Sequence, residues 1–289
     1  MNKSLILYRS AQFSLPLLIY IIVLSKIDPS QIGELLIPVA LASFLGNIFN
    51  QNLDNYFSSL IFGKKLHRKH RDLFSIILSY KFIFFIIFFI IWTLIAYLQQ
   101  SWVWFFAIYT AIATMFIPNY YIAALGNYKL LLFGFFTEKF LITVFVLFYL
   151  NSTNYLYLNA IYFIALLFNL SITYYLLDVH KSVASITSLK NNARLMSRYK
   201  NFLLDARFFI VGKSTQFHTD FFKFFMGSLF DSYAIVIVDF MEKIINTQKS
   251  FFSIINNHFQ YKVAHKKIIL NVLKKSLAAS ACIIVFNIL

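Results

Sequence analysis

Amide, hydroxyl and carboxylate side chains recur at three- and four-residue steps inside an otherwise apolar stretch, residues 34–60. They are Ser43, Asn47, Asn50, Gln51, Asp54 and Ser58. These steps place side chains on one face of an α-helix. Amides and hydroxyls offer hydrogen bonds, and a carboxylate adds a charge that a proton or cation can neutralise. A polar stripe of this length predicts one wall of a hydrophilic cavity that accepts a bulky polar substrate.

A second stripe and several isolated charges interrupt other apolar stretches. The second stripe, in residues 201–222 and just beyond, comprises Asp205, Lys213, Gln216, Asp220 and Lys223. The isolated polar residues are Arg9, Gln12, Lys81, the neighbours Glu138 and Lys139, and the group Asp239, Glu242, Lys243 and Lys249. A charge inside a bilayer costs free energy and usually faces a cavity or a partner. We expect a cavity at the two stripes, while any single residue also fits a structural role as an interhelical hydrogen bond or a local ion pair. The spacing suits local ion pairs of Asp220 with Lys223, three residues apart, and of Asp239 with Lys243, four residues apart.

The composition requires a lipid environment for the helices that hold these residues. Of 289 residues, 60% are hydrophobic and 13% are charged, and the mean hydropathy is +0.71. A soluble domain is about half apolar and about a quarter charged. One membrane span needs about 20 apolar residues. The sequence therefore predicts an all-α, polytopic transmembrane bundle of about eight or nine spans, at residues 5–24, 34–60, 73–98, 102–125, 127–150, 155–177, 201–222, 233–257 and 268–289.

Basic residues divide the loops between these spans into two sets. The loops near residues 64–71, 129, 181–200 and 262–267 are rich in lysine and arginine, whereas the alternate loops hold little beyond Lys26. By the positive-inside rule, the first set and the N-terminus are cytoplasmic. The net charge of +15 thus reflects topology and not nucleic-acid binding. We expect a multi-pass protein of a bacterial inner (cytoplasmic) membrane.

The longest cytoplasmic loop divides the chain into two parts. Residues 1–177 form an expected six-helix bundle, 178–200 a basic linker and 201–289 a partial C-terminal bundle. Transporters are often built from paired bundles. An enzyme is not expected: the sequence has no glycine-rich phosphate loop, metal-ligand spacing or nucleophile elbow, so neither catalytic residues nor a metal site are predicted.

Two segments then resemble a known family, the Wzx-type flippases of O-antigen and polysaccharide repeat units. These belong to the multidrug/oligosaccharidyl-lipid/polysaccharide exporter superfamily. Residues 117–121, followed by 126–129, look like the family's proline–aromatic segment after the fourth helix, and residues 231–244 look like its eighth helix. The order of six helices, basic linker and charged seventh helix is also similar. The family has more helices, so the resemblance implies a C-terminally shortened relative with an incomplete second bundle.

The resemblance implies a substrate and roles for the polar residues. The substrate would be an undecaprenyl-diphosphate-linked oligosaccharide, moved from the cytoplasmic to the periplasmic leaflet by alternating access. Cations for the diphosphate would be Arg9, Lys81, Lys139 and Lys213, and amides for the sugar would be Asn47, Asn50 and Gln51. Carboxylates for proton or sodium coupling would be Asp54, Glu138, Asp205 and Asp220, with no other cofactor.

The expected partners are the lipid-linked oligosaccharide, membrane lipids, and the polysaccharide polymerase and chain-length components, with no nucleic acid. Three alternatives stay open. They are another secondary exporter of the same superfamily, a membrane-embedded polymerase or acyltransferase, and an inactive remnant or assembly subunit.

Overall fold

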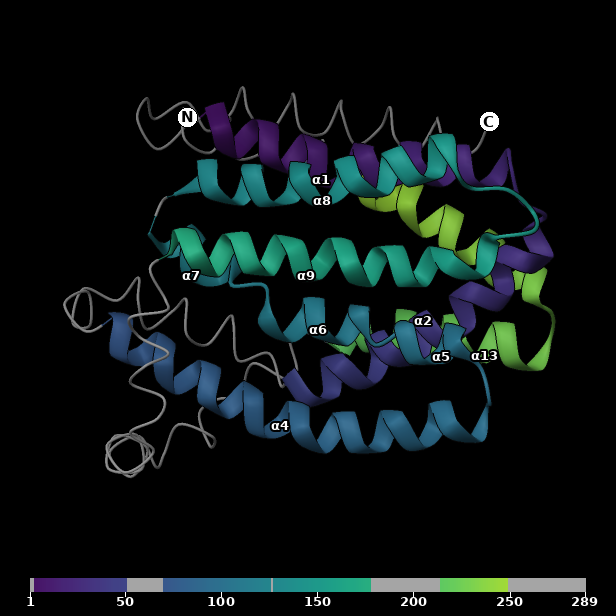
Figure 1. Cartoon of the computed structure of the whole chain (residues 1–289), viewed down its shortest axis with the longest axis horizontal. Helices are drawn as coiled ribbons and strands as arrows, with labels where there is room; N and C mark the ends of the chain where they lie inside the picture. Colours follow the sequence, from purple (N-terminus) through teal and green to yellow (C-terminus); the bar gives the residue numbers. More distant parts are fainter. Residues whose placement is uncertain (1–2, 51–69, 126, 178–213, 249–289) are drawn as a thin grey trace, which may run out of the picture.

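The computed structural model describes residues 3–50, 70–125, 127–177 and 214–248. Within these ranges the regular structure is entirely helical, as expected (Figure 1). The elements are α1 (Lys3–Leu24), α2 (Pro29–Asn50), α4 (His70–Leu98), α5 (Trp102–Phe106), α6 (Tyr109–Phe116), α7 (Asn119–Ala124), α8 (Tyr128–Phe148), the short 3₁₀ helix η2 (Tyr155–Tyr157), α9 (Leu158–Leu176) and α13 (Ser214–Leu229). A further helix covers residues 232–248.

Five helical segments are long and apolar enough to cross a membrane. They are Ser4–Leu24, Pro29–Asn50, Ile77–Leu98, Tyr128–Phe148 and Tyr155–Leu176. Their outward faces carry large apolar side chains, such as Ile90 and Phe140, which are 64% and 67% exposed. Lipid is the environment that such faces require. The all-helical fold is confirmed in the described part of the chain, where these five helices agree with a membrane protein, and the expected span 268–289 lies outside it.

The prediction of one continuous helix over residues 102–125 is wrong, because the helix is interrupted before Pro118. Helix α6 ends at Phe116, Ile117 is extended with φ −68° and ψ 116°, and α7 begins at Asn119. Proline lacks an amide hydrogen, and it disfavours a helical conformation in the residue before it. Between α5 and α6 the backbone tightens into a 3₁₀-type turn, in which the Thr110 amide donates to the Ala107 carbonyl at 3.2 Å.

Helix α2 begins at Pro29, five residues before the expected start at 34. The Asp28 carboxylate accepts hydrogen bonds from the Ser30 amide and hydroxyl at 2.9 and 2.6 Å, which is the arrangement of a helix N-cap. These hydrogen bonds lower the pKa of Asp28, which lies in the turn outside the spans. At its other end α2 is described only to Asn50, so residues 51–60 of the expected helix lie outside the described residues.

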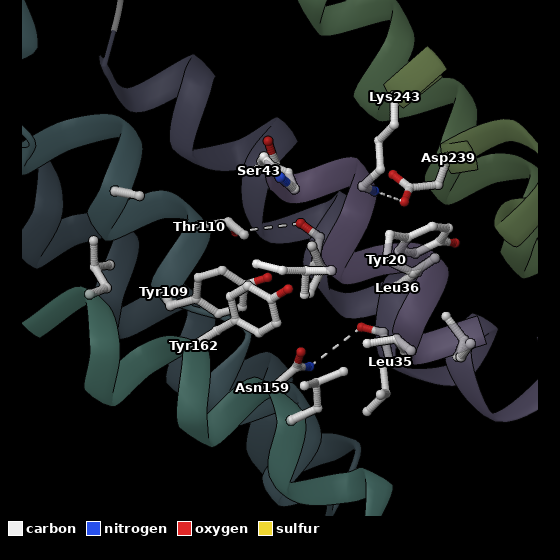
Figure 2. A pocket seen from close by; sticks show the side chains of 18 of the residues that line it. Tyr20, Leu35, Leu36, Ser43, Tyr109, Thr110, Asn159, Tyr162, Asp239 and Lys243 are labelled. Atoms are coloured by element: carbon white, nitrogen blue, oxygen red, sulfur yellow. Dashed lines mark hydrogen bonds and ion pairs between the residues drawn. The ribbon is translucent and has the colours of Figure 1, made fainter. Parts of the chain in front are cut away.

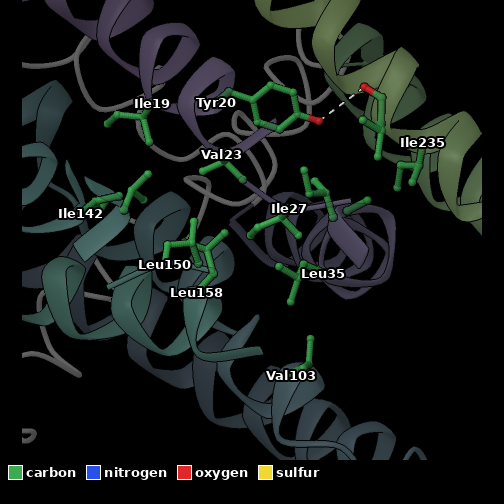
Figure 3. Close-up of a cluster of buried hydrophobic side chains, with 14 of the residues drawn as sticks. Ile19, Tyr20, Val23, Ile27, Leu35, Val103, Ile142, Leu150, Leu158 and Ile235 are labelled. Atoms are coloured by element: carbon green, nitrogen blue, oxygen red, sulfur yellow. Dashed lines mark hydrogen bonds between the residues drawn. The ribbon is translucent and has the colours of Figure 1, made fainter. Parts of the chain in front are cut away.

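Helix α2 runs through the middle of the bundle and packs closely on both sides. A Cβ placed on Gly33 would come within 2.0 Å of the Ser232 carbonyl oxygen, at the start of helix 232–248. On Gly46 it would come within 2.7 Å of the Ala111 Cα in α6. Figure 3 shows the apolar cluster in which α1, α2, α8, α9 and helix 232–248 meet. The lack of side chains at these two glycines therefore lets α2 contact both neighbours.

The short turns gather at one end of the bundle. Residues 25–28, 99–101 and 149–154 lie together on the right of Figure 1, and the start of α1 lies at the opposite end. Tyr97 and Trp102 stand out there, 77% and 78% exposed, as at a membrane–water interface. Lys26 also lies at this end, and its ammonium donates to the Val146 and Leu147 carbonyls at the end of α8. Lysine is a favourable partner for the carbonyls at a helix C-terminus.

Candidate functional site: a charged cavity in the bundle

A cavity of about 350 Å³ lies between α1, α2, α6, α8, α9 and helix 232–248 (Figure 2). Its volume is at the lower end of the range of ligand-binding pockets. Apolar side chains form much of the wall. The polar side chains that line it are Tyr20, Ser43, Tyr109, Thr110, Thr114, Glu138, Lys139, Asn159, Tyr162, Asp239 and Lys243. A polar wall inside a bundle of apolar helices makes this the candidate site.

One charged pair in the wall comes from α8. The Lys139 ammonium lies 2.6 Å from the Glu138 carboxylate, and Asn169 of α9 donates to the other oxygen of Glu138 at 2.7 Å. A Cβ on Gly134 would lie 2.4 Å from the Asn169 side-chain oxygen, so the glycine provides the space for this amide. Helices α8 and α9 together position an ion pair that is mostly shielded from bulk water.

The opposite side of the wall holds a second charged group. Asp239 accepts from Lys223 of α13 at 2.7 Å and also pairs with Lys243, one helical turn further along its own helix. Lys223 pairs in addition with Glu242. The Lys243 ammonium lies 4.2 Å from the centroid of the Tyr20 ring, which adds a cation–π contact from α1. Asp239 is thus compensated by two lysines in spite of being only 5% exposed.

Asp220 joins the two polar stripes of the sequence. One of its carboxylate oxygens accepts from the Ser43 hydroxyl at 2.8 Å and from the Asn47 amide at 2.9 Å. Ser43, Asp220, Lys223 and Asp239 also line a neighbouring hollow of about 100 Å³. The stripes on α2 and α13 therefore face each other beside the main cavity.

The structure places the predicted substrate and coupling residues in different surroundings. Lys139 and Glu138 line the cavity, Asn47 and Asp220 lie beside it, and Asn50 donates to the Thr114 carbonyl at 3.3 Å. Arg9 on α1 and Lys81, buried on α4, do not line this cavity. Four other predicted residues lie outside the described residues: Gln51, Asp54, Asp205 and Lys213.

The local ion pairs expected from spacing have different outcomes. Asp239 and Lys243, four residues apart, do pair. Lys223, three residues from Asp220, instead reaches Asp239 and Glu242 on the next helix. The turn at residues 230–231 brings the two helices together, and this contact gives Lys223 closer partners than the one on its own helix.

The aromatic part of the wall was not predicted from the sequence. Tyr109 of α6 and Tyr162 of α9 have near-parallel rings, with centroids 5.2 Å apart and an interplanar angle of 17°. Lys139 lies 5.8 Å from the Tyr162 ring. With 18 tyrosines in the chain, residue type alone does not single out these two. Their role depends on which helices are neighbours.

No family model, curated protein or solved structure matches this chain.

Proposed function

We propose that this protein is a transporter that moves a lipid-linked oligosaccharide across a bacterial inner membrane by alternating access. The supporting observation is the cavity of about 350 Å³, which brings ion pairs and hydroxyl groups into a bundle of membrane-spanning helices. The proposed substrate is an undecaprenyl-diphosphate-linked O-antigen or capsule repeat unit, as the family resemblance implies. The lipid tail stays in the bilayer while the polar part crosses through the bundle.

Buried charges of this number favour transport over a purely structural role. Replacing a buried ion pair with apolar residues is often neutral or stabilising. Stability alone therefore does not explain why this bundle contains several buried ion pairs. The cavity wall carries pairs from two directions, Glu138 with Lys139 and Asp239 with Lys243. Charges that face a polar path need not be fully desolvated.

Alternating access requires the walls to separate and close again. Here α8 and α9 supply one set of polar groups, and helix 232–248 with α13 supplies the other. We propose that these two sides rock against each other about α2, which contacts both Ser232 and Ala111 through its glycines. Glu138 and Asp220 are the proposed coupling carboxylates within the described residues. A change from buried to wet surroundings changes the proton affinity of a carboxylate.

A second candidate is the export of a smaller polar solute. It is favoured by the cavity volume, because about 350 Å³ is near the minimum for a ligand-binding pocket. Such an exporter would share the bundle but would not restore surface glycan synthesis.

The test is complementation of a flippase-deficient bacterial strain that expresses the matching glycan-synthesis genes. Lipopolysaccharide or capsule is profiled by gel electrophoresis, with membrane insertion of the chain verified by fractionation. We expect a restored long-chain ladder. An inserted chain that restores no ladder contradicts glycolipid transport, and resistance to a toxic solute in the same strain supports the second candidate.

A further inference from the structure

The hydroxyl groups of Tyr109 and Tyr162 are directed into the cavity, side by side (Figure 2). They come from different helices, α6 and α9, and the stacking of their rings fixes their spacing. Neither hydroxyl forms a hydrogen bond with any of the residues that the structure describes. A hydroxyl in an apolar environment without a hydrogen bond costs free energy. The occupant of the cavity, whether water or ligand, must therefore supply hydrogen-bonding groups at this position.

The other polar groups around the cavity already have partners. The Thr110 hydroxyl donates to the Ala107 carbonyl at 3.1 Å, and the Tyr20 hydroxyl to the Val236 carbonyl at 3.4 Å. The Asn159 amide lies 3.4 Å from the Leu35 carbonyl. Among the described residues that line the cavity, the two tyrosines are thus the side chains whose donors form no hydrogen bond at all.

The charges of the described wall cancel. Lys139 pairs with Glu138, and Lys243 pairs with Asp239, so neither lysine is an uncompensated cation. A diphosphate brought into this cavity would face two carboxylates as well as two ammonium groups. Desolvating an anion needs a surplus of positive partners. A neutral group has no such requirement, and hydroxyl groups match the two tyrosines.

We propose that Tyr109 and Tyr162 form a subsite for an uncharged, hydroxyl-bearing ring, and that this cavity has no binding site for the diphosphate. The near-parallel phenol rings present two donors at a fixed spacing, which suits hydroxyls fixed on a ring. The identification of that ring as one sugar unit of a lipid-linked glycan rests on the proposed function. Lys139, which the resemblance assigns to the diphosphate, lines the same cavity but is neutralised by Glu138, so we place the diphosphate site elsewhere.

The test uses the full chain in lipid nanodiscs. Saturation-transfer NMR is recorded with four methyl glycosides (glucose, galactose, mannose and N-acetylglucosamine), and phosphorus NMR with inorganic pyrophosphate. The variants are Tyr109→Phe, Tyr162→Phe and the double change, which keep the rings and remove only the hydroxyls. Tyr97→Phe, on the 77% exposed tyrosine at the end of the bundle, is the matched control. Thermal unfolding verifies that each variant is folded.

We expect at least one glycoside to bind the wild type and the Tyr97→Phe control equally. Each lost hydrogen bond should weaken binding about fivefold, and the double change should weaken it more than tenfold. Pyrophosphate should show no line broadening that depends on the protein. The proposal is overturned if no glycoside binds, or if the double variant binds glycosides as tightly as the wild type does. It is also overturned if pyrophosphate binds to the wild type and no longer binds to an Ala113→Phe variant, in which the added ring fills the cavity.

Complementation separates this proposal from the proposed function. If the ladder is restored but glycoside binding does not depend on the tyrosine hydroxyls, the proposed subsite is overturned and the proposed function is not. Glycoside binding that depends on the hydroxyls, without a ladder, supports the subsite and contradicts the transport of lipid-linked oligosaccharide.

Discussion

Asp239 shows at the scale of single residues how the bundle holds buried charge. It is 5% exposed and pairs with lysines from two helices, Lys223 and Lys243. A buried ion pair often contributes little net stability, because desolvation offsets the attraction. Removing one partner is different, since the remaining charge stays buried and uncompensated.

We therefore expect Asp239→Asn to lower the free energy of unfolding by about 3 kcal/mol. Replacing the pair together, Asp239→Leu with Lys243→Met, should recover part of that loss because one uncompensated lysine is also removed. Unfolding by SDS in mixed micelles measures both. Glu34→Gln, an exposed carboxylate that bonds to Tyr155, is the control and should change stability by less than about 0.5 kcal/mol. A double variant less stable than Asp239→Asn contradicts this explanation.

At the scale of the elements, the position of α2 depends on two close approaches. Gly33 faces a backbone carbonyl of residue Ser232, whereas Gly227 of α13 faces side-chain atoms of Ile37. A backbone cannot move aside as a side chain can. The same small addition should thus have different consequences at the two glycines.

We expect Gly33→Ala to destabilise the bundle by about 2 kcal/mol through overpacking. Gly227→Ala should cost less, since the Ile37 side chain can adjust whereas the Ser232 carbonyl cannot. Thermal unfolding of both purified variants tests the difference. Equal stability of the two variants would show that the approach of α2 to Ser232 is not tight.

The sequence predicted those features that depend on a single helix. Spacing alone indicated the pair Asp239–Lys243, and polar periodicity indicated that Ser43 and Asn47 share a face. The break at Pro118 was missed because the apolar run continues through it. Hydropathy indicates only which residues prefer lipid, and it does not indicate where the backbone leaves the helical conformation.

Features that depend on several helices could not be predicted from the sequence. The stacking of Tyr109 on Tyr162 requires α6 to lie beside α9, and the contact of Lys223 with Asp239 requires the turn at 230–231. A helical period does not specify which helix is the neighbour. Which residues of different helices line the cavity is therefore known only from the structure of the whole bundle.

At the scale of the whole molecule, the orientation in the membrane remains a prediction. The loops expected outside, near residues 99–101 and 151–154, share one end of the bundle (Figure 1). Their lack of charge, against the lysines near residue 65, is the basis for placing them in the periplasm.

Cysteine labelling in intact cells tests this orientation. With Cys282 replaced by serine, a membrane-impermeant maleimide should label Ser152→Cys and should leave Lys65→Cys unlabelled until the cells are opened. If only Lys65→Cys were labelled in intact cells, the chain would have the opposite orientation in the membrane.

If the proposed function is right, the glycan of the substrate passes through the charged cavity. The most direct measurement compares the glycan ladder restored by the wild type with that of Ala113→Phe, which adds a ring to the cavity from α6 and replaces no member of an ion pair. Leu94→Phe, on a side chain that is 59% exposed on α4, adds a similar ring to the lipid-facing surface as the control. We expect the control to restore the ladder as the wild type does, and the cavity variant to be inserted in the membrane at the same level with the ladder lost. A full ladder from Ala113→Phe would show that the glycan does not pass through this cavity.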